Sequence, residues 1–207
     1  MLKIGFDFDN TLVNYDETFY KLALERGIIP KNLIKDKISV RNYLREQGKD
    51  KLFTSLQGEV YGKKLFDIKP SSGLIRILKI LKNKGHNLLI VSHKTKTPFL
   101  GPKYDLHQAA AKWLEKNGFF NQQGLNLPFD KVFFEETFQK KLSRISDLSC
   151  DVFIDDLPEV LCELNKKITG IHFCNNFKQT SKNQFITLSE WNNLPDIIDE
   201  IIRKKNI

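Results

Sequence analysis

The sequence predicts an α/β protein built on a doubly wound parallel sheet, with a small helical insertion. Two observations lead to this fold class: apolar strand-like runs alternate with helical patterns along the chain, and one long block shows helical periodicity alone. Such alternation is typical of a parallel sheet covered by helices. With 207 residues, 41% of them hydrophobic, the chain suits one medium-sized domain with a substantial core.

Six short apolar runs are the expected strands of this sheet. The first begins almost at the start of the chain, and the last is short enough to be expected at an edge. In chain order the expected strands are residues 3–8, 87–92, 131–134, 151–155, 170–174 and 184–188.

Helical patterns separate these runs. Residues 71–85 carry apolar side chains at helical spacing, with serine before them and Gly85 after, which predicts a capped amphipathic helix. Residues 105–118 repeat this pattern, with Asp105 as the expected N-cap. A final helix is expected over about residues 195–205, where a proline occupies the first turn.

The block from about Tyr15 to Lys69 breaks the alternation, because it shows no convincing strand and is too long for an ordinary crossover. We therefore expect a catalytic core of residues 1–14 and 70–207, with a helical cap at 15–69. The segment from Lys31 to Lys64 contains seven lysines and two arginines but only two aspartates and two glutamates, so most of the net charge of +8 lies here. As a cap, this block would present cations to an anionic substrate; the alternative is that they merely solvate helix surfaces.

Composition narrows the class of protein further. The chain has three cysteines, an odd number, and they are widely spaced, as expected for reduced core residues of a cytosolic protein: Cys150, Cys162 and Cys174. No signal peptide and no segment of membrane-spanning length is evident, so we expect a cytoplasmic protein without a membrane partner. The basic charge favours anionic partners. Nucleic acid is not indicated as the partner, because the sequence has no basic stretch interleaved with aromatic residues. Oligomeric state has no indicator in the sequence, and we interpret His86 and His172 as structural.

Polar residues follow three of the expected strands. Asp7 and Asp9 would face the same side if the first strand continued through them, and two like charges so close repel unless a cation, a proton or water intervenes. Asp155 and Asp156 end another strand, and Ser92 ends a third. Because ligand sites in doubly wound sheets form at the carboxyl ends of the strands, we expect these residues to converge on one crevice.

Four carboxylates in one crevice favour a hard cation, and ligation by oxygen alone predicts Mg²⁺. A lysine would balance the remaining charge, and Lys140 and Lys141 lie near the start of a helix expected over about residues 136–148. Taking the apolar residues of this helix as its buried stripe places Lys141 beside the stripe, so we favour Lys141. A solvated surface lysine is the alternative for either residue taken alone.

Taken together and in order, these motifs resemble those of the haloacid dehalogenase-like (HAD) hydrolase superfamily. The matching segments are DFDNT at 7–11, VS at 91–92, a lysine, and DD at 155–156, spread over about residues 3–158. Asn10 stands where many members have glycine. The resemblance implies a Rossmann-like core, a helical cap and phosphoryl transfer, and the second aspartate of DFDNT points to phosphate rather than halide chemistry. Without the other motifs, an Asp-x-Asp at a strand end would be explained as a loop or helix-cap device.

The resemblance also implies a role for individual residues. Asp7 would be the nucleophile that forms an aspartyl-phosphate, and Asp9 would act as general acid and then as general base. Ser92 would hydrogen-bond the phosphoryl group, whose charge Lys141 would stabilise. The Mg²⁺ ligands implied in this way are Asp7, the backbone carbonyl of Asp9, Asp155 and, directly or through another ligand, Asp156.

Three further residues are predicted to bind substrate: Thr11, and His93 and Lys94 at the start of a turn-rich loop after Ser92. The function favoured by these features is a Mg²⁺-dependent phosphatase acting on a small phosphorylated metabolite, such as a sugar phosphate or a nucleotide. One alternative is a phosphomutase that uses the same intermediate. Another is a binding protein on a degenerate scaffold, which the intact set of motifs disfavours.

Overall fold

The computed structural model describes residues 1–174 and 185–205, so Gln184, the first residue of the last expected strand, lies outside them. The chain forms two compact units. The first comprises Met1–Leu12, Pro70–His93 and Gly118–Ile207, and the second comprises Val13–Lys69 and Lys94–Asn117. The segment 94–117, which the sequence-based boundaries assign to the core, belongs by its contacts to the second unit.

The first unit is built on a six-stranded parallel sheet with the strand order β3-β2-β1-β4-β5-β6. The inner strands read as nearly continuous apolar runs because both faces of such a sheet are buried. The strands are β1 (Lys3–Phe6), β2 (Asn87–His93), β3 (Val132–Glu135), β4 (Val152–Asp155), β5 (Thr169–Phe173) and β6 (Ile186–Leu188). The predicted doubly wound parallel sheet is therefore confirmed.

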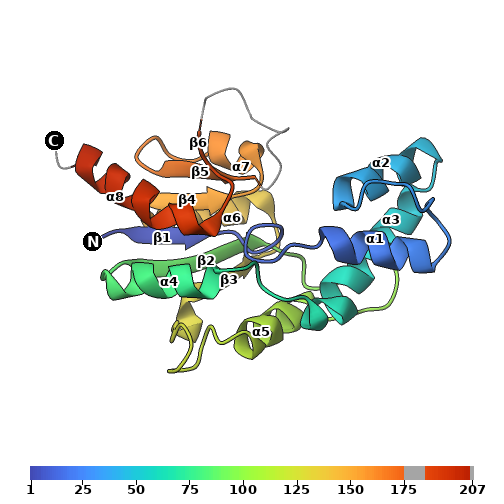
Figure 1. Ribbon diagram of the computed structural model, residues 1–207, viewed down its shortest axis with the longest axis horizontal. Coiled ribbons are helices and arrows are strands. Elements are labelled where there is room, and N and C mark those ends of the chain that lie inside the picture. Colours follow the sequence, from blue (N-terminus) through green and yellow to red (C-terminus); the bar gives the residue numbers. More distant parts are fainter. Residues whose placement is uncertain (175–184, 206–207) are drawn as a thin grey trace. The chain divides into compact units, whose positions relative to one another are not determined.

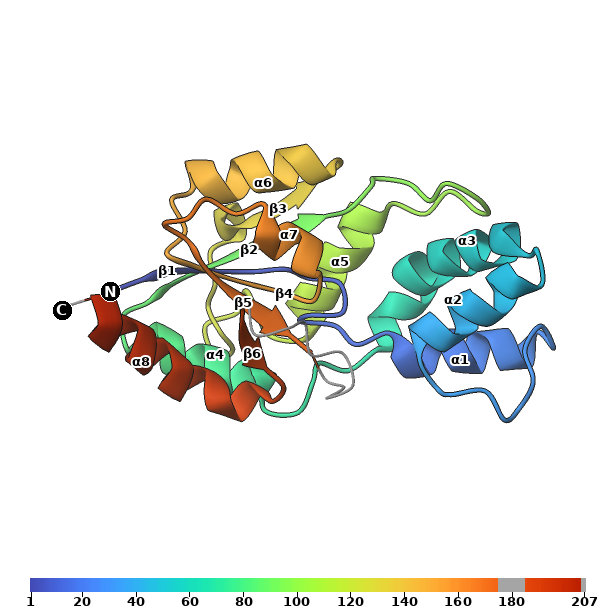
Figure 2. The same ribbon diagram turned by 90° about the horizontal axis from the view of Figure 1, so that it is seen from above.

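Helices cover both faces of this sheet, as Figures 1 and 2 show. On one face lie α4 (Leu74–Asn83) and α8 (Leu194–Lys205), and on the other lie α6 (Phe138–Asp147) and α7 (Pro158–Cys162). The N-cap of α4 is Gly73 rather than a serine, with a φ of +80° that glycine adopts without steric cost.

The strands β1 and β4 approach each other closely at Gly5. This residue pairs with Phe153 of β4, and a Cβ atom on Gly5 would lie only 2.5 Å from Cδ2 of the Phe153 ring. Phe153 is fully buried in the core beneath α6 and α7. The missing side chain therefore makes room for an aromatic ring directly beside the strand that leads to Asp7.

Of the three cysteines expected in the core, Cys150 and Cys174 are buried, but Cys162, at the end of α7, is exposed.

The second unit contains α1 (Asp16–Glu25), α2 (Lys37–Glu46), α3 (Asp50–Glu59), a π-helical turn (Val60–Lys64) and α5 (Leu106–Lys116). Residues 15–69, all of which are described, contain no strand, as the periodicity predicted. Trp113 of α5 donates from Nε1 to the carbonyl oxygen of Ile68 at 2.6 Å, which ties α5 to this unit. In the described part of the chain, no helix combines the length and the apolar surface needed to cross a bilayer.

Candidate active site

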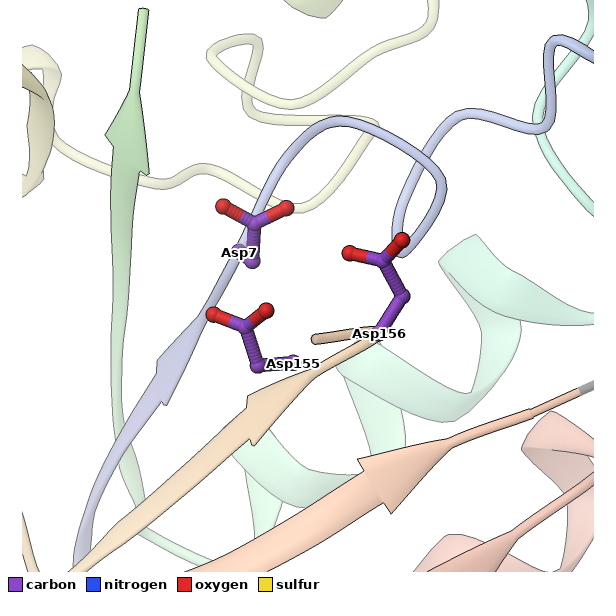
Figure 3. A group of neighbouring side chains, drawn as sticks. All are labelled: Asp7, Asp155 and Asp156. Carbon is purple, nitrogen blue, oxygen red and sulfur yellow. The ribbon is translucent and has the colours of Figure 1, made fainter. Parts of the chain in front are cut away.

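Three aspartates meet at the carboxyl ends of β1 and β4 (Figure 3). Asp7 directly follows β1, and its backbone N–H donates to the carbonyl oxygen of Ile154 at 2.9 Å, which joins the two strand ends. Asp155 is the last residue of β4, and Asp156 follows it. Each of the three side chains offers an oxygen within 4.8 Å of the others. We call these three residues the aspartate cluster.

The ammonium group of Lys141 lies between two members of the cluster. Its Nζ donates to Oδ1 of Asp7 and to Oδ2 of Asp155, in each case at 2.6 Å. The three residues are 2%, 4% and 0% exposed, respectively. Lys141 reaches the cluster from the start of α6, whereas the neighbouring Lys140 is exposed. The geometry therefore assigns the lysine position at the cluster to Lys141.

Burial and charge together set the electrostatics of the cluster. Burial, followed by the charge of Asp7, raises the pKa of Asp155 to about 7, although Lys141 opposes this shift. For Lys141, burial acts to lower the pKa, but the two carboxylates outweigh it and hold the pKa above its ordinary value. The ammonium therefore stays charged. Even when Asp155 holds a proton, two carboxylates remain against one ammonium, an excess of negative charge that a divalent cation would offset.

The donor atoms of the cluster suit a hard cation. All of them are carboxylate oxygens, the ligands that Mg²⁺ and Ca²⁺ prefer. Oxygens that share one Mg²⁺ at about 2.1 Å lie roughly 3 to 4.2 Å apart, so a spread within 4.8 Å needs only small movements to enclose an ion. The residues present thus fit the metal that the sequence predicts.

Two buried hydroxyl groups of the first unit lack a hydrogen-bond partner among the described residues. They are Oγ of Ser92, near the carboxyl end of β2, and Oγ1 of Thr11, in the turn after Asp7. A buried polar atom without a partner costs folding free energy unless something else bonds to it. Both hydroxyls are therefore candidates for contact with a bound group.

The chain leaves the extended conformation immediately after β1. The first strand was expected to continue to Phe8 but ends at Phe6. Asp9 forms an isolated β-bridge among turn residues, half-buried and outside the aspartate cluster. Asn10 has a φ of +59°, a left-handed conformation that asparagine tolerates better than most other residues with a side chain. This tolerance explains how Asn10 can stand where the resemblance has glycine.

The other two predicted substrate-binding residues fall in different units. His93 ends β2 in the first unit and is exposed. Lys94 belongs to the second unit, where it is buried with its Nζ 5.0 Å from the ring centroid of Tyr61. Contact of either residue with substrate stays a prediction.

His172 contacts the backbone of Asp156, although the sequence alone led us to interpret it as a structural residue. It pairs with Asp155 in the register of β4 and β5, and its Nε2 lies 3.2 Å from the backbone oxygen of Asp156. No local signal could have identified it, because the pairing of two strands that lie far apart in the chain arises only in the folded sheet.

Comparison with known proteins agrees with this architecture. No protein-family model matches the chain. A Bacillus cereus protein named "Putative nucleotidase" is 24% identical over 206 residues, which cover 95% of this chain and 98% of that protein. The structure of a predicted phosphatase from Clostridium acetobutylicum aligns with a TM-score of 0.63 at 16% identity, over 97% of this chain and 99% of the other.

A HAD family hydrolase from Deinococcus radiodurans, solved with bound phosphate and sodium, aligns with a TM-score of 0.62 at 14% identity. The alignment covers 96% of this chain and 95% of that structure. These likenesses confirm the fold that the sequence motifs predicted.

Proposed function

We propose that this chain, which has the fold of the haloacid dehalogenase-like hydrolases, is a Mg²⁺-dependent phosphatase acting on a small phosphorylated metabolite. The observation that carries the proposal is the Lys141 ammonium, 2.6 Å from both Asp7 and Asp155 within a buried aspartate cluster. A carboxylate can attack an anionic phosphoryl group only where fixed positive charge offsets the repulsion. Lys141 supplies one such charge beside the proposed nucleophile.

In the first step, a carboxylate oxygen of Asp7 forms a bond to phosphorus while the bond from phosphorus to the ester oxygen breaks. Asp9, protonated at this stage, gives its proton to the leaving oxygen. The product alcohol departs, and the phosphoryl group stays on Asp7 as an aspartyl-phosphate. Lys141 balances the negative charge around Asp7 throughout.

In the second step, Asp9 is a carboxylate and takes a proton from water as the water oxygen bonds to phosphorus. The bond between Asp7 and phosphorus breaks, which releases inorganic phosphate and restores both aspartates. The Ser92 hydroxyl donates to a phosphoryl oxygen, which gives this buried group the partner that it lacks among the described residues. Mg²⁺ held by the aspartate cluster and the Asp9 carbonyl would neutralise charge on the phosphoryl oxygens.

Within the class of small phosphorylated metabolites, we favour a nucleotide over a sugar phosphate. The support is the nucleotidase name of a protein that aligns with 95% of this chain.

A screen of phosphorylated metabolites with purified protein tests the proposal. We expect Mg²⁺-dependent phosphate release that EDTA abolishes, and phosphate trapped on Asp7 that mass spectrometry locates. The absence of both phosphate release and the Asp7 adduct across nucleotides and sugar phosphates would contradict the proposal. Return of the phosphoryl group to another position of the substrate would instead indicate a phosphomutase.

We also propose that the helical segment 15–69 acts as a cap whose cations attract the substrate. The double variant Lys63→Glu/Lys64→Glu should then raise KM several-fold at low salt, and less at high salt because exposed charges are screened. Lys166→Glu/Lys167→Glu, an exposed pair in the first unit, is the matched control. An equal effect of the two pairs on KM would indicate a general charge effect rather than a cap.

A further inference from the structure

His172 contacts the backbone that carries two members of the aspartate cluster. It lies in β5, is 3% exposed, and its Nε2 is 3.2 Å from the carbonyl oxygen of Asp156. A carbonyl oxygen can only accept a hydrogen bond, so Nε2 is the nitrogen that carries the proton and donates it. The contact thus fixes both the ring orientation and the position of this carbonyl.

The carbonyl belongs to the peptide unit between Asp156 and Leu157. The N–H of the same unit donates to Oδ1 of Asp155 at 2.9 Å. Because a peptide unit is planar, holding its carbonyl also fixes the direction of its N–H. One imidazole therefore acts on the backbone of Asp156 and, through the planar peptide, on one oxygen of Asp155, whose other oxygen is held by Lys141 at 2.6 Å.

We infer that His172 is a positioning residue that orients Asp155 and Asp156 for metal binding through the peptide unit between Asp156 and Leu157. The inference rests on the proposed function for the metal itself. Residues that orient metal ligands in this way typically change metal affinity by 10- to 100-fold when they are replaced. His172 would set the affinity of the cluster for Mg²⁺ without being a ligand.

Calorimetric titration of the whole protein with MgCl₂ tests this role. In His172→Phe, which keeps a flat ring but has no N–H donor, the Mg²⁺ dissociation constant should rise about tenfold. In His172→Gln, which keeps an N–H at a similar reach, it should stay close to the wild-type value. His172→Leu is the second donor-free variant if His172→Phe does not fold. An unchanged dissociation constant in a folded donor-free variant, or equal weakening in His172→Gln, would overturn the inference.

His86 provides the matched control. It is a second buried histidine of the first unit, but it lies beside the amino end of β2, where its Nδ1 accepts from the backbone N–H of Leu2. His86→Phe should leave the Mg²⁺ dissociation constant unchanged. A rise in His86→Phe equal to that in His172→Phe would show that loss of any buried imidazole weakens binding, and would also overturn the inference.

Deuterium exchange at the Leu157 amide, measured without metal, separates this inference from the proposed function. Exchange at Leu157 should be faster in His172→Phe than in the wild type, because the peptide unit loses the bond to its carbonyl. An unchanged exchange rate would overturn the inference even if the enzyme needs Mg²⁺. If the wild type binds no Mg²⁺, the metal-dependent function fails, while the exchange rate still decides whether His172 holds this peptide.

Discussion

The polar groups at the two ends of the parallel sheet differ in whether hydrogen-bond and charge partners satisfy them. At the amino end, backbone N–H groups are satisfied by side chains: Lys3 donates to Oδ2 of Asp151 at 2.8 Å, and Leu2 donates to Nδ1 of His86 at 3.1 Å. At the carboxyl end, three carboxylates cluster and a single buried ammonium contacts two of them. The buried hydroxyls of Ser92 and Thr11 have no partner within the described parts of the chain.

This difference separates groups that stabilise the fold from groups that are available for chemistry. A side chain that satisfies a backbone donor lowers the free energy of the folded state, whereas like charges held together and unpaired buried hydroxyls raise it. Changes at the carboxyl end should therefore affect turnover more than stability, with Lys141 as an exception. Changes at the amino end should affect stability alone.

The largest effect is expected for Asp7→Asn. An amide is a poor nucleophile, so phosphate release should fall by at least about 10⁴-fold, while circular dichroism shows an intact fold. The control at the amino end is Asp151→Asn, which keeps an oxygen to accept from Lys3 and should retain full turnover. Substantial activity in purified Asp7→Asn would rule out the covalent mechanism.

Lys141→Met should have the largest effect on stability. The change leaves Asp7 and Asp155 buried without their ammonium, so the free energy of unfolding in urea should fall by about 3 to 5 kcal/mol. Lys140→Met, at the exposed neighbouring position, should stay within about 0.5 kcal/mol of the wild type. Similar losses in the two variants would contradict the central place of Lys141 in the cluster.

Ser92→Ala should lower activity without lowering stability. The hydroxyl has no partner among the described residues, so the free energy of unfolding should stay level or rise by up to about 1 kcal/mol. Loss of a donor to the phosphoryl group should lower kcat by roughly 10²-fold. A clear loss of stability with normal kcat would place Ser92 with the structural groups of the amino end.

His86→Phe should have the smallest effect, and on stability alone. Loss of the acceptor for Leu2 should lower the free energy of unfolding by about 1 kcal/mol at neutral pH, with turnover unchanged. His86→Asn keeps an oxygen near the position of Nδ1 and should recover part of this loss. A loss of turnover comparable to that of Ser92→Ala would contradict the proposal that groups at the amino end of the sheet affect stability alone.

The same histidine should give stability a pH dependence. Burial, with the charged N-terminus and Lys84, lowers the pKa of His86 below its ordinary value of 6.5, so the unfolded chain takes up the proton first as pH falls. The stability that neutral His86 contributes is therefore present above about pH 6.5 and is lost as pH falls through the lower folded pKa. Urea unfolding between about pH 7.5 and 5.5 should show a shallower decline in His86→Phe than in the wild type. Identical slopes would contradict this origin.

The sheet and the convergence of the aspartates were predictable because both follow from local pattern and a topological rule. Apolar runs mark the strands, and parallel strands place their carboxyl ends at one edge, so Asp7 and Asp155 could be brought together from the sequence. The helical register similarly distinguished Lys141 from Lys140. These inferences require only a knowledge of which way each side chain faces.

Features that depend on exact backbone path or on distant pairing were not predictable. The end of β1 at Phe6 and the left-handed Asn10 reflect a turn whose shape the strand pattern does not encode. The grouping of 94–117 with the helical unit depends on contacts such as that of Trp113 with Ile68, which are far apart in sequence. His172 became visible only through the pairing of β5 with β4.

The close contact at Gly5 affects how the results of a systematic mutational scan of this protein should be interpreted. Alanine at Gly5 would drive a methyl group into the Phe153 ring, so substitutions there should abolish function in a growth assay made to depend on this protein's activity, as substitutions of Asp7 should. The two tolerance profiles would look alike although one position is steric and the other chemical. Measuring protein abundance alongside growth would separate them, because Gly5 variants should be depleted from the soluble fraction while Asp7→Asn accumulates normally.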